Sequence, residues 1–220
     1  RLAASAASPA SLPTGTFQYV AGTGLYVNAG GGNPASHAAA VGHRLYGIRV
    51  SGRAWITVDG FAVTRTEDRA IYFSSASDHA IITHNRATWA YHAGIQISTS
   101  TAALIASNVV ASCLDHGIYL SGATSSTVQD NESSHNAKPG NAAANGIYLS
   151  AGSTDDLVQR NRLHDNLGIG LHAVDMFVIT RDIWSLRLNT QYTFQQGSLT
   201  NLSLAISENN FLGTRSLFAL

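Results

Sequence analysis

The phrase GIYLSGATSSTVQDN at residues 117–131 returns as GIYLSAGSTDDLVQRN at residues 146–161. Two marks within it recur along the chain in a constant phase. One is an Ile or Val three residues before an Asn, as in Val128 and Asn131. The other is a small residue that opens an alternating apolar stretch, and it occurs at Gly47, Ala70, Gly94, Gly117, Gly146 and Gly168. A period of roughly 23 residues is typical of solenoid proteins, in which each repeat is one structural unit.

Apolar residues alternate within each repeat with the period of a β-strand. Ile118 and Leu120 point to one side of an extended chain, and Tyr119 and Ser121 point to the other. No window sustains the rhythm of an amphipathic helix. Stacking the repeats gives two inner aliphatic columns, which read Ile71, Ile95, Ile118, Ile147, Ile169 and Phe73, Ile97, Leu120, Leu149, Leu171. The sequence therefore predicts an all-β solenoid of six to seven coils, because one repeat cannot bury its apolar face alone.

The recurring asparagines fit the bends of such a solenoid. Asn tolerates left-handed backbone angles, and its amide can both donate to and accept from equivalent residues in neighbouring coils. With its V-x-x-N turns and stacked aliphatic residues, the chain resembles the right-handed parallel β-helix proteins of the pectin-lyase-like superfamily. The resemblance implies a right-handed parallel β-helix. It does not by itself imply one activity, because that superfamily contains lyases, hydrolases, epimerases, tailspikes and adhesins.

The repeats divide the chain into four parts. We expect a flexible leader at residues 1–15, an irregular N-terminal cap with lead-in strands at 16–46, coils at 47–182 and an irregular coil or edge at 183–220. The fragments GTGLYVN and WITVDGF resemble the lead-in of bacterial secreted carbohydrate-active β-helix proteins. That resemblance implies a secreted or cell-surface location, and the opening without Met suggests a piece of a longer chain.

Composition excludes several classes of function. Charged residues make up 12% of the 220 residues and the formal net charge is +0, so we expect neither nucleic-acid nor membrane-surface binding. No apolar run reaches the roughly 18 residues that cross a bilayer. Cys113 is the single cysteine, which excludes an intrachain disulfide.

An outward column on the strands that follow the small residues is a candidate substrate-binding surface. It comprises Tyr72, Gln96, Tyr119 and Tyr148, followed two residues later by a serine column that we expect His172 to end. Tyrosine rings offer an apolar face and a polar tip to a sugar. The alternative is that these rings only stabilise the stacked coils.

A polar corner before these strands supplies the candidate catalytic residues. They are Asp115, His116, His135, Lys138, His164 and Asp165, with Asp68 and His92 extending the same edge. His135 and Asp165 both stand four residues after a ladder asparagine, so we expect them to be neighbours. The alternatives are that the histidines cap turns and that Lys138 is an exposed loop lysine in the insertion at residues 132–145.

Each candidate chemistry needs different residues. A lyase or epimerase needs a base to remove the proton next to a sugar carboxylate, and a cation to neutralise that carboxylate. The corner offers imidazoles, Lys138 and acids for a modest Ca²⁺ site. A glycoside hydrolase needs two carboxyl groups, for which Asp115 and Asp165 are the pair. Asp155 and Asp156 are interpreted as solvated turn residues.

These features favour a bacterial secreted protein that acts on an acidic polysaccharide by β-elimination or epimerisation. A non-catalytic glycan-binding or structural surface module is the alternative, and a hydrolase is the second alternative. The metal, the substrate and the oligomeric state stay open.

Overall fold

The computed structural model describes residues 3–30, 42–141, 144–150, 152–173, 178–181, 184–185 and 192–194. The chain divides into two compact units, residues 1–41 and 42–220. In the described part of the chain, the helical structure is a single short turn, and no helix there has the length and apolarity to cross a membrane.

The first unit is a small sheet. It contains β1 (Ala3–Ala4), the 3-10 turn η1 (Pro9–Ser11), β2 (Thr16–Val20) and β3 (Gly24–Asn28). β2 and β3 form an antiparallel hairpin, and β1 pairs with β2 in parallel. The amide of Asn28 donates to the carbonyl of Leu12 at 2.7 Å, so hydrogen bonds reach into the segment expected to be a leader. That this unit caps the coils stays a prediction.

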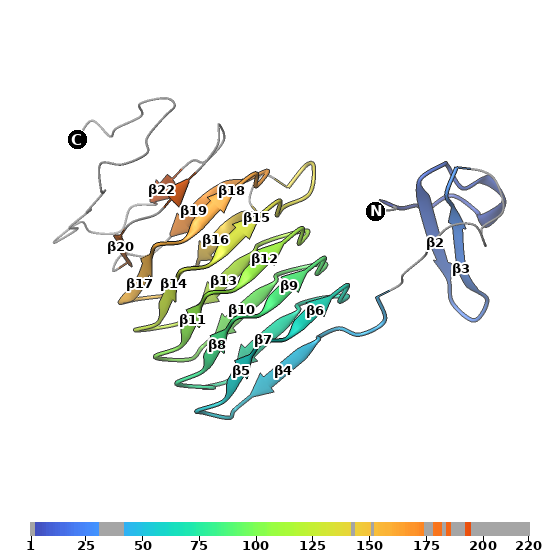
Figure 1. The fold of residues 1–220 in the computed structure, drawn as a ribbon. Helices are drawn as coiled ribbons and strands as arrows, with labels where there is room; N and C mark the ends of the chain where they lie inside the picture. Colours follow the sequence, from blue (N-terminus) through green and yellow to red (C-terminus); the bar gives the residue numbers. More distant parts are fainter. Residues whose placement is uncertain are drawn as a thin grey trace. The chain divides into compact units, whose positions relative to one another are not determined.

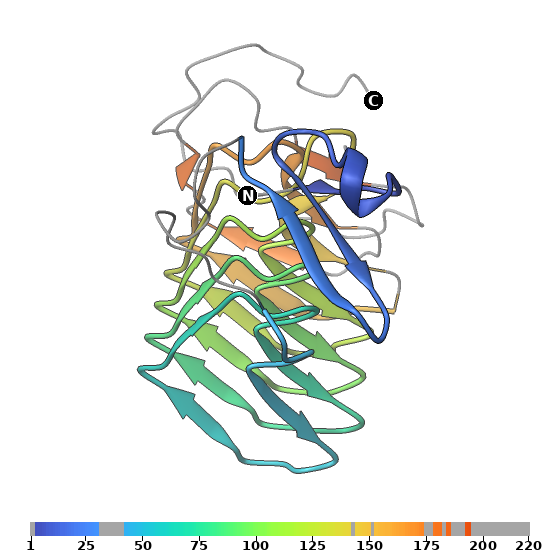
Figure 2. The same cartoon turned by 90° about the vertical axis from the view of Figure 1, so that its right-hand side faces the viewer.

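The second unit consists of three parallel sheets, whose strands stack coil upon coil (Figures 1 and 2). The first sheet contains β4 (Ile48–Ser51), β7 (Ile71–Ser74), β10 (Ile95–Ser98), β13 (Ile118–Ser121), β16 (Asn145–Leu149), β19 (Ile169–Ala173) and β22 (Tyr192–Phe194). The second contains β5 (Thr57–Asp59), β8 (Ile81–Thr83), β11 (Leu104–Ala106), β14 (Thr127–Gln129), β17 (Asp156–Gln159) and β20 (Val178–Arg181). The third contains β6 (Ala62–Thr64), β9 (Arg86–Thr88), β12 (Val109–Ala111), β15 (Glu132–Ser134), β18 (Arg162–His164) and β21 (Trp184–Ser185). Every strand pair of this unit is parallel, which confirms the predicted parallel β-helix.

The predicted inner columns are confirmed over four coils. Ile95 pairs with Ile71 and with Ile118, and Ile118 pairs with Ile147. These side chains are fully buried and form one apolar core with residues of the other two sheets. Stacking at the strand spacing of about 4.8 Å lets each coil cover the apolar side chains of the one before it.

The predicted register is wrong in the sixth coil by two residues. Ile147 pairs with Leu171 rather than Ile169, and Tyr148 pairs with His172. Gly170 therefore takes the place expected of Gly168. A Cβ added at Gly146 would lie 2.7 Å from the carbonyl oxygen of Gly170, which shows how closely the backbones approach there. The stretch GIGLHA alternates equally well from either glycine, so the pattern did not fix the register.

Four buried asparagines form a ladder at the corner between the second and third sheets. They are Asn85, Asn108, Asn131 and Asn161. The amides of the first three each donate to the side-chain oxygen of the asparagine in the next coil at 2.9–3.0 Å, and that oxygen also accepts the backbone N–H of its donor. The amide of Asn161 donates to the carbonyl of Val128 at 2.8 Å. The left-handed backbone angle lies one residue earlier than expected, at His84, Ser107, Asp130 and Arg160.

Asp156 is buried, which contradicts its interpretation as a solvated turn residue, whereas the adjacent Asp155 is exposed. The Asp156 side chain is buried in the wall of the cylinder, and its Oδ1 accepts the backbone N–H of Ser126 at 2.8 Å. One coil earlier, the Ser126 hydroxyl accepts the N–H of Ala103 in the same way at 3.2 Å. Asp156 therefore continues a column of side chains that satisfy buried backbone groups.

Candidate functional site

The outward column of the first sheet is continuous from coil to coil. Tyr72, Gln96, Tyr119, Tyr148 and His172 pair in register along β7, β10, β13, β16 and β19. We call these five residues the tyrosine stripe. The rings of Tyr119 and Tyr148 stack with centroids 5.1 Å apart, and His172 lies 5.0 Å from Tyr148. The two-residue shift of the sixth coil thus moves His172 from the expected serine column into the stripe itself.

A cation lies at the N-terminal end of the stripe. The guanidinium of Arg69 sits 4.7 Å from the centroid of the Tyr72 ring and hydrogen-bonds to Gln96 and Asp68. Arg69 is not among the candidate residues predicted from the sequence. The signal was its position directly before Ala70, which corresponds to that of His116 before Gly117.

Three of the corner residues form a compact group beside the tyrosines, the histidine–aspartate cluster of His92, Asp115 and His116. The Oδ2 atom of Asp115 lies 3.0 Å from Nε2 of His92, and its Oδ1 lies 3.5 Å from Nε2 of His116. Asn141 of the insertion also donates to Oδ1 at 3.1 Å. One carboxylate therefore orients two imidazoles and fastens the inserted loop.

His116 is held in one neutral tautomer. The backbone N–H of Asn145 donates to its Nδ1 at 3.1 Å, so the ring proton must be on Nε2, which faces Asp115. Burial lowers the pKa of His116 to about 4, against the opposing charge of Asp115. The ring also stacks on Tyr148 with centroids 4.6 Å apart. With both nitrogens engaged, His116 is a positioning residue and not a free base.

His92 has the properties of an oriented base. Burial is the main cause that lowers its pKa, while Asp115 acts in the opposite direction. Its Nε2 is next to Asp115, and its Nδ1 is buried with no hydrogen-bond partner among the described residues. Burial also lowers the pKa of His172, so this imidazole of the stripe is neutral at pH 7. The phenol of Tyr148 stays protonated, because burial and then Tyr119 raise its pKa.

Three more predicted residues, His135, His164 and Asp165, form a second group at the end of the third sheet. His164 lies between two carboxylates, with Nδ1 2.8 Å from Asp165 and Nε2 2.9 Å from Glu132. His135 is exposed, and its Nε2 is 4.0 Å from Oδ2 of Asp165, so the two residues are neighbours as expected. Arg162 pairs with Glu132 at 3.3 Å. Hydrogen bonds and close polar contacts thus join these side chains between neighbouring coils, and a catalytic role for them stays a prediction.

The structure separates the two acids of the hydrolase alternative. Asp115 contacts His92, His116 and Asn141, whereas Asp165 contacts His164 and His135. Lys138 belongs to neither group; it is exposed, and its Nζ lies 5.7 Å from the ring centroid of Tyr91. Within the ranges that the structure describes, no three His, Cys, Asp or Glu side chains are grouped to hold a metal ion. The Ca²⁺ site stays a prediction.

Comparison with known proteins agrees with this architecture. The family model described as "Right handed beta helix region" matches residues 46–184. The crystal structure of the periplasmic alginate epimerase AlgG is similar with a TM-score of 0.58 and 16% identity, and the match covers 64% of this chain and 36% of that one. A double mutant of that epimerase gives the same values. A single mutant gives a TM-score of 0.54 at 15% identity, with 64% and 42% covered.

The chain therefore spans less than half of the length of these similar structures, and a likeness at this identity concerns the fold. A search of curated proteins finds no match. Because the family model covers more than half of the residues, the chain belongs to the family of right-handed β-helix proteins.

Proposed function

We propose that this protein binds an acidic polysaccharide along the tyrosine stripe and acts on it by epimerisation or β-elimination at the histidine–aspartate cluster. The observation that carries the proposal is the position of an oriented His–Asp pair beside stacked tyrosines that continue in register over several coils. The similar epimerase is named for alginate, a polyuronate, which supports this substrate class. Its name also supports a location outside the cytoplasm.

Both reactions begin by breaking the C–H bond next to the sugar carboxylate. His92 is the base of this proposal: with Nε2 directed at Asp115, its Nδ1 accepts this proton once a bound substrate displaces the groups that bury it, and the electron pair moves into the carboxylate. Arg69 lies at the same surface and supplies positive charge to the resulting dianion. In epimerisation a proton returns to the opposite face of the carbon. In β-elimination the glycosidic oxygen leaves instead. Tyr119, whose ring centroid lies 6.3 Å from that of His92, is the proton donor in either case.

Turnover in D₂O distinguishes the two reactions. Alginate, pectate and glycosaminoglycans are each incubated with the protein, with Ca²⁺ or with a chelator. An epimerase introduces deuterium at the reacting carbon, which NMR detects, and a lyase produces the ultraviolet absorbance of an unsaturated sugar. Absence of both signals with every uronate would refute catalysis by this chain.

The alternative is a glycan-binding module without turnover. It is favoured by the engagement of both His116 nitrogens within the scaffold. Two variants separate the possibilities. If the protein is an enzyme, His92→Ala abolishes turnover and leaves binding within about twofold, whereas Tyr148→Ala weakens binding. The exposed His135→Ala is the matched histidine control and should preserve both. Binding without turnover in the unmodified protein would establish the module.

A further inference from the structure

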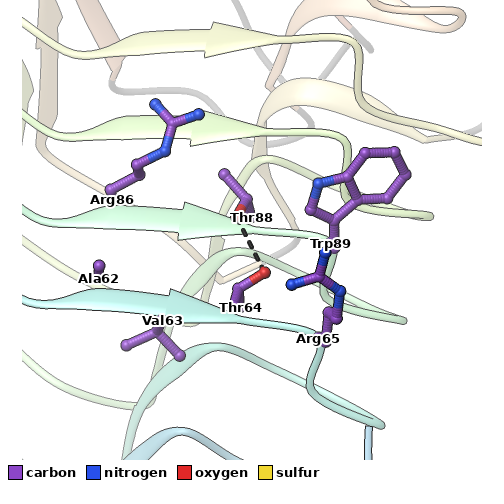
Figure 3. Close-up of a pocket in the computed structure, with 7 residues that line it drawn as sticks. All are labelled: Ala62, Val63, Thr64, Arg65, Arg86, Thr88 and Trp89. Atoms are coloured by element: carbon purple, nitrogen blue, oxygen red, sulfur yellow. Dashed lines mark hydrogen bonds between the residues drawn. The ribbon is translucent and has the colours of Figure 1, made fainter. Parts of the chain in front are cut away.

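A pocket of about 210 Å³ lies at the third sheet, whereas the tyrosine stripe belongs to the first. Figure 3 shows the residues that line this pocket. The pocket is formed between neighbouring strands β6 and β9 and the corner that follows them. Its lining comprises Ala62, Val63, Thr64, Arg65, Arg86, Thr88 and Trp89. No acidic side chain is among these residues.

The two arginines have no counter-ion within the described residues. Elsewhere in that part of the chain, Arg69, Arg160 and Arg162 each pair with an aspartate or glutamate. The side chains of Arg65 and Arg86 make no ion pair, hydrogen bond or ring contact with the described residues. Both are exposed beside the pocket. Two guanidinium groups that line one pocket without a counter-ion among the described residues favour an anionic ligand. Each planar guanidinium can donate two parallel hydrogen bonds to an anionic group such as a carboxylate.

The other lining groups also suit a sugar. The hydroxyl of Thr88 donates to that of Thr64 at 3.2 Å, which leaves the Thr64 proton available to a ligand. Trp89 is 42% exposed and offers both an indole N–H and an aromatic face. An aromatic face next to hydrogen-bond donors is the usual surface for a pyranose ring. Drug-sized ligands occupy pockets of about 300–1,000 Å³, so this smaller one suits a single sugar residue.

The corner geometry places these side chains. Arg65 and Trp89 both have positive φ angles, 58° and 60°, at the first residue after β6 and β9. Thr64 and Thr88 pair in register immediately before them. Arg65 and Trp89 are therefore held in adjacent coils at the same corner, with the two threonine hydroxyls beside them (Figure 3).

We propose that this pocket is a second saccharide site that binds one anionic sugar unit, carboxylated or sulfated, through Arg65, Arg86 and Trp89. The site goes beyond the proposed function, since it lies on another sheet and does not depend on the stripe or on turnover. In a longer acidic polymer it would retain one sugar while the stripe binds others.

Titration calorimetry of the double variant Tyr119→Ala/Tyr148→Ala, which lacks the two stacked rings at the centre of the stripe, tests the pocket apart from the stripe. The probes are a triuronate, a sulfated disaccharide, a neutral trisaccharide and inorganic sulfate. We expect an anionic saccharide to bind, the neutral one not to bind, and Arg65→Ala or Arg86→Ala to weaken binding about tenfold each. A tenfold change corresponds to about 1.4 kcal/mol. Arg53→Ala, an exposed arginine that donates to the carbonyl of Gly52, is the matched control and should change nothing.

Tryptophan fluorescence gives a second readout. The anionic saccharide should change the emission of the protein and of Trp55→Phe, and the change should be lost in Trp89→Phe. Equal binding of the neutral trisaccharide would refute the role of the arginines. Binding of sulfate as tight as that of the saccharides would refute the sugar site. Binding that survives both arginine substitutions would refute the location. None of these results depends on the epimerase or lyase assay.

Discussion

A single carboxyl group, that of Asp156, adds a pH dependence to the wall of the cylinder. Burial, together with the charge of Asp155, raises the pKa of Asp156 to about 7, although the hydrogen bond from Ser126 acts in the opposite direction. Its Oδ2 atom is buried and has no hydrogen-bond partner in the part of the chain that the structure describes. A buried, unpartnered carboxylate oxygen favours the protonated form of the acid.

The sign of the effect follows from the raised pKa. The folded state binds a proton that the unfolded chain releases near pH 4, so the free energy of unfolding falls as the pH rises from about 4 to 7. We expect Asp156→Asn to flatten this fall and to be more stable than the unmodified protein at pH 8, by about 2 kcal/mol. Urea denaturation at pH 5, 6, 7 and 8 measures it. Asp155→Asn removes the same charge from an exposed position and should leave the slope nearly unchanged. If the free energy of unfolding changed with pH in the same way in both variants, the pH dependence could not be assigned to Asp156.

The asparagine ladder illustrates how repeated elements share their buried hydrogen bonds. Asn108 is a central rung, since its Oδ1 accepts both the N–H and the amide of Asn85, and its Nδ2 donates to Asn131 and to the carbonyl of Ile82. Removing this side chain leaves several buried groups of two neighbouring coils without partners, and each such group is costly.

We expect Asn108→Ala to lower the free energy of unfolding by about 3 kcal/mol, at the upper end of ordinary single substitutions. Gln129→Ala is the control. It removes a partly buried side chain of the second sheet, whose Oε1 accepts one hydrogen bond, from Gln159, and it should cost about 0.5 kcal/mol. Chemical denaturation measures both, and similar losses would show that the ladder is not a main source of stability.

Strand positions and inner columns could be predicted from sequence because stacking imposes the same requirement on every coil. Ile118 and Ile147 are alike since both must fill one column. The role of Asp156 could not be predicted. It takes the position that Ser126 has in the neighbouring coil, this exchange of a hydroxyl for a carboxyl occurs once, and in the sequence Asp156 resembles an ordinary turn residue. The candidate site was divided for a geometric reason. The offset from a ladder asparagine gives the position along a coil. Asp165 directly follows a strand of the third sheet, whereas Asp115 comes shortly before a strand of the first sheet, so the two acids lie next to different sheets.

At the scale of the whole molecule, the stripe runs across successive strands and therefore along the stacking direction of the coils. Each strand adds about 4.8 Å, which is close to the length of one sugar residue in an extended polysaccharide. A bound chain can therefore run along the stripe from Tyr72 to His172 with one sugar per coil. At the buried Gln96 the contact falls to Arg69, to which Gln96 is hydrogen-bonded.

Affinity should accordingly rise with oligosaccharide length and then level off. We expect a gain of several-fold per added uronate up to a tetramer or pentamer, and less than twofold beyond it, because the five stripe residues span about four strand spacings. Calorimetry with a size series of oligouronates measures this, and Gln96→Ala should shorten the range of lengths over which affinity grows. A Kd that does not change with length would mean that only one sugar is bound.

The residue that directly follows each of the strands β6, β9, β12, β15 and β18 of the third sheet has a left-handed backbone angle, and this has a consequence for how the surface of such a protein can vary in sequence. These five positions are occupied by arginine, tryptophan, serine, histidine and aspartate, at Arg65, Trp89, Ser112, His135 and Asp165, with the same sign of φ. The backbone thus accepts any of these chemistries at one place without altering the buried columns. One of these residues, His135, lies within the insertion of the fourth coil. Randomising the five positions would give a library of surfaces with different ligand preferences on an unchanged scaffold, and natural variation has the same freedom.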